Sequence, residues 1–215
     1  LGPGSSITHD ALRILARQGC ALAAIGEVAA RFYSAPPLMP DTSALARQQV
    51  TLWADPKTRM EVARAMYAIR FGEIVRTRDI EVLRGQEGAR IKRSYQLSAE
   101  RHGIQWKGRN YDRANPNAGD IPNQALNHAA SAMRAAASVA VAAVGAIPDI
   151  ADLYRHDVTL DIACGAAREA LKTGEPVERL TRQEAARLLR KRSVIPSMID
   201  HIKILIGPKV EAEPE

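Results

Sequence analysis

Helical periodicity dominates the sequence from Thr42 almost to its C-terminal end. Alanine, leucine, arginine and glutamate fill long segments in which apolar residues recur at helical spacing, and runs of β-branched residues are very few. The alanine-rich stretch 127–144 offers small side chains on most faces, which permits close packing at the centre of a bundle. The pattern predicts a mainly α fold with helices over residues 43–53, 56–71, 77–101, 121–144, 149–172 and 181–206.

The residues that precede this helical region follow a different pattern. Apolar spacing over residues 7–18 predicts a short helix, and brief apolar runs over residues 20–25 and 29–33 favour a small hairpin. A proline-rich linker over residues 35–41 follows. We therefore expect a small β-rich unit over residues 1–40, a helical bundle domain over residues 41–207 and a disordered tail over residues 208–215.

Cysteine usage and hydropathy narrow the class of protein. Cys20 and Cys164 lie far apart with no CxxC or Cys/His spacing, so we expect buried free thiols rather than a disulfide or a zinc site. The longest apolar run, residues 135–147, falls well short of the roughly 20 residues that a membrane span requires. These features predict a cytoplasmic protein that has no membrane partner.

Neither the histidines nor any nucleotide-binding or hydrolase motif indicates a function for this sequence. The five histidines are scattered without HxH or HExxH spacing, and His128, on the alanine-rich helix, is expected to be a core histidine. The sequence contains no GxSxG, Walker or Rossmann pattern, which leaves nucleotide-dependent and serine-hydrolase chemistry without candidate residues.

A glutamate between two glycines is the first candidate for chemistry. Glu87 lies between Gly85 and Gly88 in a predicted helix, where each glycine costs up to about 1 kcal/mol relative to alanine. Glycines beside a carboxylate allow a metal, a phosphate or another backbone to approach, and Arg84 and Arg90 add positive charge on either side. A kinked helix with a surface glutamate paired to these arginines explains the same pattern equally well.

Two aspartates three residues apart are the second candidate. Asp149 and Asp152 follow Pro148, which opens a predicted helix, so both carboxylates project from nearly the same face of its first turn. Carboxylate oxygens so placed can bind a hard divalent cation. Capping and the helix dipole also favour aspartate in a first turn, and taken alone the motif is better explained in that way.

The net charge of +6 favours a polyanionic partner, although a solvated arginine-rich surface has the same composition. Basic residues outnumber acidic ones between Arg84 and Arg113, and aromatic residues are interleaved with them. This mixture suits a DNA surface on which bases of a frayed end can stack, or else a solvated helix followed by a surface loop. A second basic cluster that could extend the same surface comprises Arg187, Arg190, Lys191 and Arg192.

Five motifs in series resemble a known family. They are residues 66–73 (MYAIRFGE), 83–90 (LRGQEGAR), 106–112 (WKGRNYD), 120–124 (DIPNQ) and 149–152 (DIAD). Their order and spacing are similar to those of the CRISPR-associated integrase and endonuclease family called Cas-one, in its type I-E form. The resemblance extends over almost the whole chain, and it implies that residues 41–207 are the helical catalytic lobe.

The resemblance implies a metal-dependent transesterase that joins the 3′-hydroxyl ends of captured DNA, the prespacer, to a CRISPR repeat. Glu87 and Asp152 would hold Mg²⁺ or Mn²⁺ with Asp149 beside them, and Tyr111 would lie where the DNA strands separate. Phosphate contacts would come from Arg31, Arg84, Arg90 and Arg109. The implied partners are double-stranded prespacer DNA, repeat DNA, a second copy of the chain in a homodimer, and a small ferredoxin-like companion protein.

The sequence departs from the family in two places. Relatives carry an N-terminal β-sandwich-like domain, of which residues 1–40 resemble only the closing part. Relatives also carry a glycine-phenylalanine-histidine segment and a loop before the aspartates, whereas here residues 145–148 lead straight into Asp149. Either this sequence lacks a loop that the natural protein carries, which we favour, or the chain is a natural deletion with an impaired metal site.

Three hypotheses follow. The first is the metal-dependent integrase and endonuclease, and the second is a non-catalytic DNA-binding or assembly subunit of the same complex. The third is a basic helical module such as a repressor, which would need a compact helix-turn-helix with a solvent-facing recognition helix. The sequence instead places its candidate carboxylates on long helices that we expect to be internal.

Overall fold

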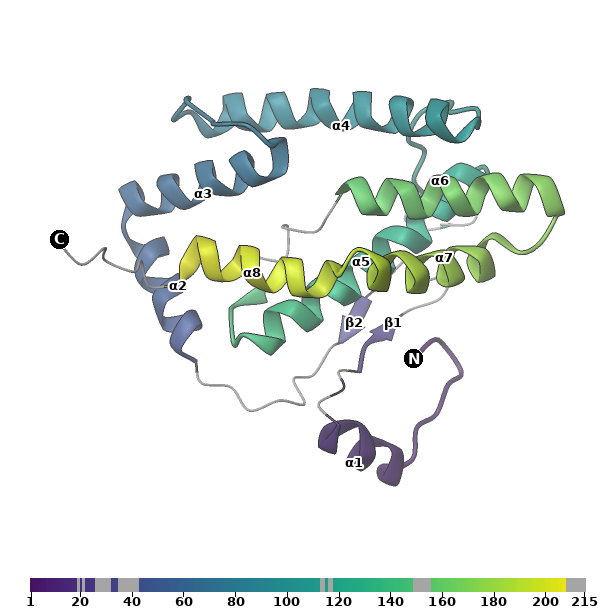
Figure 1. The fold of residues 1–215 in the computed structure, drawn as a ribbon, viewed down its shortest axis with the longest axis horizontal. Helices are drawn as coiled ribbons and strands as arrows, with labels where there is room; N and C mark the ends of the chain where they lie inside the picture. The colour runs from purple at the N-terminus through teal and green to yellow at the C-terminus, as the bar shows by residue number, and fades with distance from the viewer. Residues whose placement is uncertain are drawn as a thin grey trace.

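The computed structural model describes residues 1–18, 20, 22–25, 32–34, 43–112, 115, 118–148 and 156–207. These residues form the predicted mainly α fold (Figure 1). In chain order the elements are α1 (His9–Arg17), β1 (Ala24–Ile25), β2 (Phe32–Ser34), α2 (Ala44–Ala54), α3 (Pro56–Phe71), α4 (Ile80–His102), α5 (Ile121–Ala143), α6 (His156–Thr173), α7 (Val177–Lys191) and α8 (Val194–Ile206).

Helix α5 forms the centre of the bundle, in contact with α6, α7 and α8. Its alanines allow this close approach, since Ala125, Ala129 and Ala140 are completely buried against their neighbours. Met133 on α5 and Ile162 on α6 fill the space between the helices and are also completely buried. The prediction that the alanine-rich stretch is a core helix is therefore confirmed.

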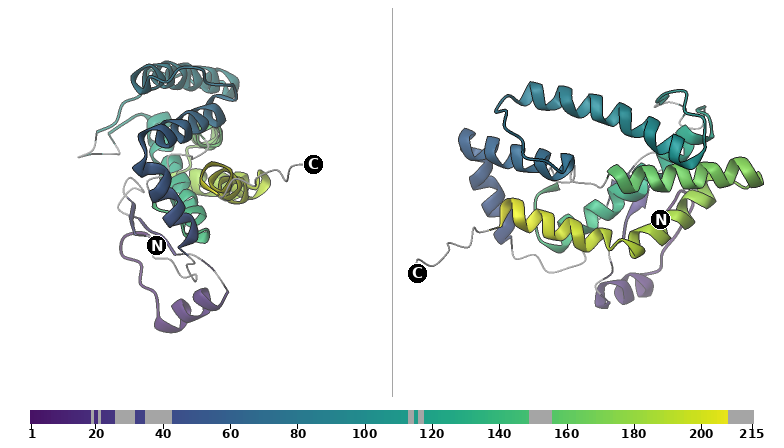
Figure 2. Two further views of the ribbon diagram at one scale, coloured as in Figure 1. Left: turned by 90° about the vertical axis from the view of Figure 1, so that its left-hand side faces the viewer. Right: turned by 45° about the horizontal axis from the view of Figure 1, so that its top comes forward.

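Helices α3 and α4 form one edge of the molecule, as the two views of Figure 2 show. Helix α3 begins at Pro56 after Asp55, whose carboxylate accepts a hydrogen bond from the Thr58 amide at 2.9 Å, and it ends at Gly72 with φ of 68°. Helix α4 begins after Asp79, whose side chain accepts a hydrogen bond from the Glu81 amide at 2.9 Å. The connection between them runs back along α3, where Arg64 donates a hydrogen bond to the Val75 carbonyl at 2.7 Å, so the end of α3 lies beside Glu87 and Arg90 in the middle of α4.

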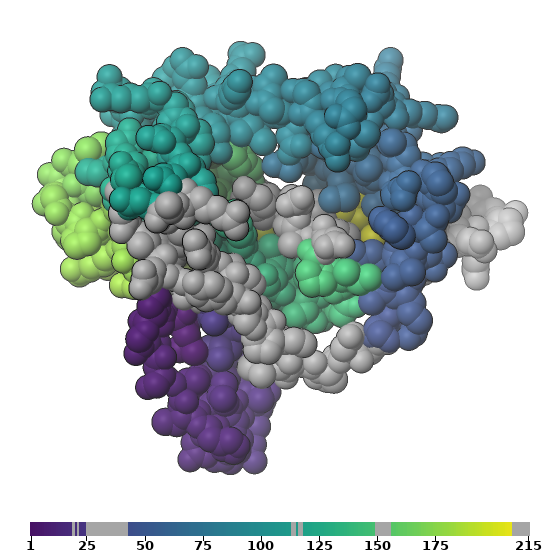
Figure 3. Space-filling model, turned by 180° about the vertical axis from the view of Figure 1, so that it is seen from behind, coloured from purple at the N-terminus to yellow at the C-terminus, as the bar shows by residue number. Residues whose placement is uncertain are grey.

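Seen from behind, α1 projects from the edge opposite α4 (Figure 3). The expected strand pair is present, because β1 and β2 pair antiparallel with Ala24 opposite Ser34 and Ile25 opposite Phe32. In the part of the chain that the structure describes, every helix is too short or too polar to span a lipid bilayer.

The prediction of one helix over residues 181–206 is wrong. Helices α7 and α8 are separate, and the chain between them turns at Ser193, whose φ is 47°. Pro196 explains the break, because its ring nitrogen could not donate to the Arg192 carbonyl in a continuous helix. In the first turn of α8 the missing donor costs nothing, since amides there have no partner within the helix.

The cysteine prediction is half right. Cys164 on α6 is buried, and burial raises the pKa of its thiol. Cys20 is exposed instead of buried, because it lies outside the helical core in the N-terminal part of the chain. Both thiols are free.

Acid is expected to destabilise the fold through His128. This residue is 5% exposed, as predicted for a core histidine, and burial lowers the pKa of its imidazole below the ordinary 6.5, against an opposing effect of the Glu178 charge. As the pH falls through 6.5 the unfolded chain takes up a proton that the folded chain resists, so the folded state loses stability. We expect the free energy of unfolding, measured by urea denaturation, to fall between about pH 7 and about pH 5. The fall should be smaller in His128→Gln, and an identical fall in both proteins would contradict this assignment.

Candidate functional site

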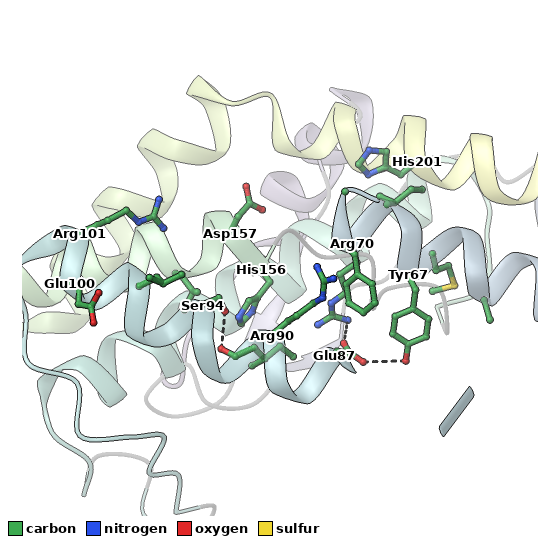
Figure 4. A pocket seen from close by; sticks show the side chains of 18 residues that line it. Tyr67, Arg70, Glu87, Arg90, Ser94, Glu100, Arg101, His156, Asp157 and His201 are labelled. Carbon is green, nitrogen blue, oxygen red and sulfur yellow. Dashed lines mark hydrogen bonds and ion pairs between the residues drawn. The ribbon is translucent and has the colours of Figure 1, made fainter. Parts of the chain in front are cut away.

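A cavity of about 1150 Å³ lies between α3, α4, the start of α6 and α8 (Figure 4). Its lining combines apolar side chains, among them Met66 and Ile91, with a group of titratable ones. The titratable residues in the lining are Tyr67 and Arg70 from α3, Glu87, Arg90, Glu100 and Arg101 from α4, His156 and Asp157 from α6, and His201 from α8. The cavity therefore brings together groups from four helices that are distant in sequence.

Glu87 projects into this cavity and is held there by two side chains of α3. Its carboxylate lies 2.5 Å from a guanidinium nitrogen of Arg70 and accepts a hydrogen bond from the Tyr67 hydroxyl at 3.2 Å. Only 19% of the Glu87 side chain is exposed. Burial and, after it, the Glu87 charge raise the pKa of Tyr67, so the phenol stays a hydrogen-bond donor. Glu87 is thus an oriented, partly desolvated carboxylate.

The glycines beside Glu87 face outward. A Cβ atom added at Gly85 or Gly88 would meet nothing within 4 Å, so no described part of this chain approaches the helix there. Helix α4 runs without a break from Ile80 to His102, and Glu87 pairs with Arg70 of α3 instead of with the arginines beside it on α4 that the alternative explanation required. The two glycines therefore leave part of the α4 surface beside the cavity without side chains.

His156 forms part of the same cavity at the start of α6. Its ring packs edge-on against Tyr95, with ring centroids 5.4 Å apart and an interplanar angle of 76°, and Tyr95 in turn stacks on Trp106 at 5.1 Å. Burial and, after it, the positive charge of Arg70 lower the pKa of His156, which favours the neutral imidazole. This residue was missed in the sequence, where it carries no ligand motif.

Three predicted site residues, Asp149, Asp152 and Arg31, lie outside the described residues. Among the residues that are described, no group of three or more His, Cys, Asp or Glu side chains is close enough to share a metal ion. Asp149 and Asp152 precede His156 by seven and four residues in the sequence. Whether they join Glu87 stays a prediction.

Three of the arginines predicted to contact DNA, Arg84, Arg90 and Arg187, are held in surface ion pairs. Arg90 pairs with Glu73 and lies over the Phe71 ring at 4.4 Å, and Arg84 pairs with Glu81 at 2.7 Å. Exposed pairs of this kind contribute at most about 1 kcal/mol, so a phosphate can replace the carboxylate at little cost. In the second basic cluster Arg187 donates to Glu184 at 2.5 and 2.7 Å, and Arg190 donates to the Ala186 carbonyl at 3.2 Å. Their contacts with DNA stay predictions.

Arg109 is bound to the protein itself. Its guanidinium donates to the side-chain oxygens of Asn123 at 3.0 Å and Asn127 at 2.6 Å, both buried on α5, and it lies over the Tyr111 ring at 5.1 Å. Tyr111 is 46% exposed, so the network holds the loop while its ring stays accessible. Sequence reasoning missed the two asparagines, although their spacing of four residues places them on one face of a helix.

Known proteins match nearly the whole chain. The CRISPR-associated endonuclease Cas1 2 of Thermus thermophilus is 34% identical over 220 residues, which cover 94% of this chain and 66% of the relative. The CRISPR-associated endonuclease Cas1 of Clostridium sp. is 33% identical over 229 residues, which cover 99% of this chain and 76% of the relative. The chain belongs to the Cas1 family. A scan against protein-family models finds no match.

A solved structure supports the assignment to Cas1. The crystal structure of a TtCas1–DNA complex superimposes with a TM-score of 0.72 at 33% identity, covering 96% of this chain and 82% of that one. Membership of the Cas1 family replaces the hypothesis of a repressor-like module. The names of these relatives give no subtype, so type I-E stays a prediction.

Proposed function

We propose that this Cas1 chain is a metal-dependent DNA integrase and endonuclease of CRISPR adaptation, of type I-E. It would join prespacer 3′-hydroxyl ends to the CRISPR repeat by transesterification. The observation that carries the proposal is Glu87, a carboxylate oriented by Arg70 and Tyr67 inside a cavity, in a chain of the Cas1 family. Glu81 also pairs with an arginine, but its side chain is 71% exposed, whereas that of Glu87 is 19% exposed.

Glu87, Asp152 and Asp149 would together supply the oxygen donors that a hard divalent cation prefers. The Arg70 guanidinium now pairs with the Glu87 carboxylate at 2.5 Å and would have to release it for a cation to bind. Glu87 would hold Mg²⁺ or Mn²⁺ together with Asp152 and Asp149, since the four residue steps from Asp152 to His156, which lines the same cavity, span at most about 14 Å. When bound, the ion would polarise the scissile phosphate and favour in-line attack by the 3′-hydroxyl.

The remaining residues would bind and orient the DNA. Arg31, Arg84, Arg90, Arg187 and Arg190 would hold phosphates, exchanging their carboxylate partners where they have them. Arg109 would act mainly by fixing the loop that presents Tyr111, on which a base at the strand-separation point could stack. The related TtCas1 structure is a complex with DNA, which supports a DNA partner for this chain. We also propose that the chain forms a homodimer, binds a small ferredoxin-like companion protein and acts in the cytoplasm.

A non-catalytic DNA-binding or assembly subunit is the second candidate. The observation that favours it is the sequence at residues 145–148, which leads into Asp149 without the histidine segment expected from the family resemblance. Such a subunit would bind prespacer DNA and leave its ends unjoined.

Metal dependence separates the two candidates. We expect the protein to join a fluorescent prespacer to a supercoiled plasmid bearing a repeat when Mn²⁺ is present, and to lose joining in EDTA while DNA binding in a gel-shift assay persists. The physical reason is that the phosphate charge at the attacked centre is balanced only when the cation is bound. DNA binding without joining in Mn²⁺ would establish the assembly role, and joining that persists in EDTA would remove the metal from the mechanism.

A further inference from the structure

Arg70 is a partly buried cation at the wall of the cavity. Its side chain enters the cavity from the last turn of α3, and that of Glu87 enters from α4 (Figure 4). One guanidinium nitrogen of Arg70 lies 2.5 Å from one carboxylate oxygen of Glu87, and 26% of the Arg70 side chain is exposed. A guanidinium carries five N–H donors in a planar fork, which matches two oxygens of a phosphate. The contact with Glu87 joins a single nitrogen to a single oxygen and does not use this fork geometry.

The Arg70–Glu87 pair is more costly to open than the surface pairs of the same helix. The side chains of Arg84 and Glu81 are 64% and 71% exposed, so water solvates both charges when they separate. Those of Arg70 and Glu87 are 26% and 19% exposed, so a charge left there without its partner is poorly solvated. A phosphate that takes Arg70 would leave the Glu87 carboxylate in this state.

We propose that Arg70 binds a phosphate of DNA that enters the cavity, and that its ion pair with Glu87 opposes this binding. The inference rests on the DNA partner in the proposed function, and it adds an arginine that was absent from the predicted phosphate contacts. Glu87 and the phosphate compete for one guanidinium, so removing the Glu87 charge strengthens the binding of DNA. The Glu87 carboxylate is then released from Arg70 only in the complex with DNA, while the Tyr67 hydroxyl continues to orient it.

The test is a double-mutant cycle on DNA affinity, measured in EDTA so that no metal ion contributes. The probe is a fluorescently labelled DNA duplex with single-stranded 3′ ends, and fluorescence anisotropy gives its dissociation constant. The cycle compares Glu87→Gln, Arg70→Met and the double variant with the unmutated protein, and Arg70→Gln replaces Arg70→Met if the methionine variant does not fold. Glu100→Gln is the matched control, since Glu100 lines the same cavity and lies outside the Arg70 pair. Thermal melts followed by circular dichroism confirm that each variant is folded.

We expect Glu87→Gln to bind the duplex about tenfold more tightly than the unmutated protein, because Arg70 then contacts a phosphate without leaving a charged partner behind. The affinity of Glu87→Gln should also fall more steeply with salt, by up to about one in the logarithmic slope, since one more phosphate is neutralised. In the Arg70→Met background Glu87→Gln should change the affinity by less than about twofold, and so should Glu100→Gln in the unmutated background.

Unchanged or weaker binding by Glu87→Gln, or an equal gain in the Arg70→Met background, would overturn the role of Arg70 and leave the proposed joining reaction standing. The expected affinities together with no joining in Mn²⁺ would overturn that reaction and keep the role of Arg70. Failure of the unmutated protein to bind the duplex would overturn both.

Discussion

DNA joining by Glu87→Gln is expected to fall by roughly a hundredfold or more, the scale on which losing one electrostatic contact to a transition state acts. Glutamine has the same size and can still accept the hydrogen bond from Tyr67, but it carries no charge for a divalent cation or for Arg70. The measurement is the initial rate at which labelled prespacer is joined to the supercoiled repeat plasmid in Mn²⁺.

A matched control lies on the same helix. Glu81→Gln also removes a glutamate charge that is paired with an arginine, Arg84, but its side chain is 71% exposed at the start of α4. This variant should join DNA at nearly the unmutated rate, and both variants should still bind DNA in a gel shift. Equal joining by Glu87→Gln and the unmutated protein would show that Glu87 holds no catalytic ion.

Local signals in the sequence predicted most helix limits. The predicted helix over residues 56–71 agrees with α3, whose start is marked by Asp55 and Pro56 and whose end is marked by Gly72. The failure over residues 181–206 has a physical reason, since apolar spacing continues through the break and outweighed Pro196, the local signal that a single helix could not continue there. Periodicity reports which face of a helix is buried and says little about where the chain reverses.

The candidate site was only partly accessible to sequence reasoning. Glu87 was identified from its flanking glycines and from the family resemblance, but Arg70 and Tyr67, which orient it, are 17 and 20 residues away on another helix. Arg109 was expected to contact phosphate and proved to be held by two buried asparagines. Both cases depend on tertiary contacts, between two helices for Glu87 and between a loop and α5 for Arg109, which local propensity does not encode.

Asn123→Ala is expected to lower the free energy of unfolding by about 3 kcal/mol, because several buried polar groups would lose their partner at once. The side-chain oxygen of Asn123 accepts from Arg109 at 3.0 Å and from the Asn110 amide at 2.9 Å. Its amide nitrogen donates to the Gly108 carbonyl at 3.1 Å and to Asp120 at 2.7 Å. Urea denaturation measures the loss, which is large for one side chain because Asn123 is only 1% exposed.

The position of the loop gives this prediction a second readout. In Asn123→Ala the Asn110 amide loses its acceptor, so the hydrogen exchange of this amide should become faster. Amides in the middle of α6 should continue to exchange only when the whole protein unfolds. Asn110→Ala is the matched control, since Asn110 is exposed and contributes its backbone amide to the network, and its stability should change by no more than about 0.5 kcal/mol. Because the same loop carries Tyr111, Asn123→Ala should also weaken prespacer binding. Unchanged binding together with unchanged hydrogen exchange at the Asn110 amide would show that other contacts hold the loop.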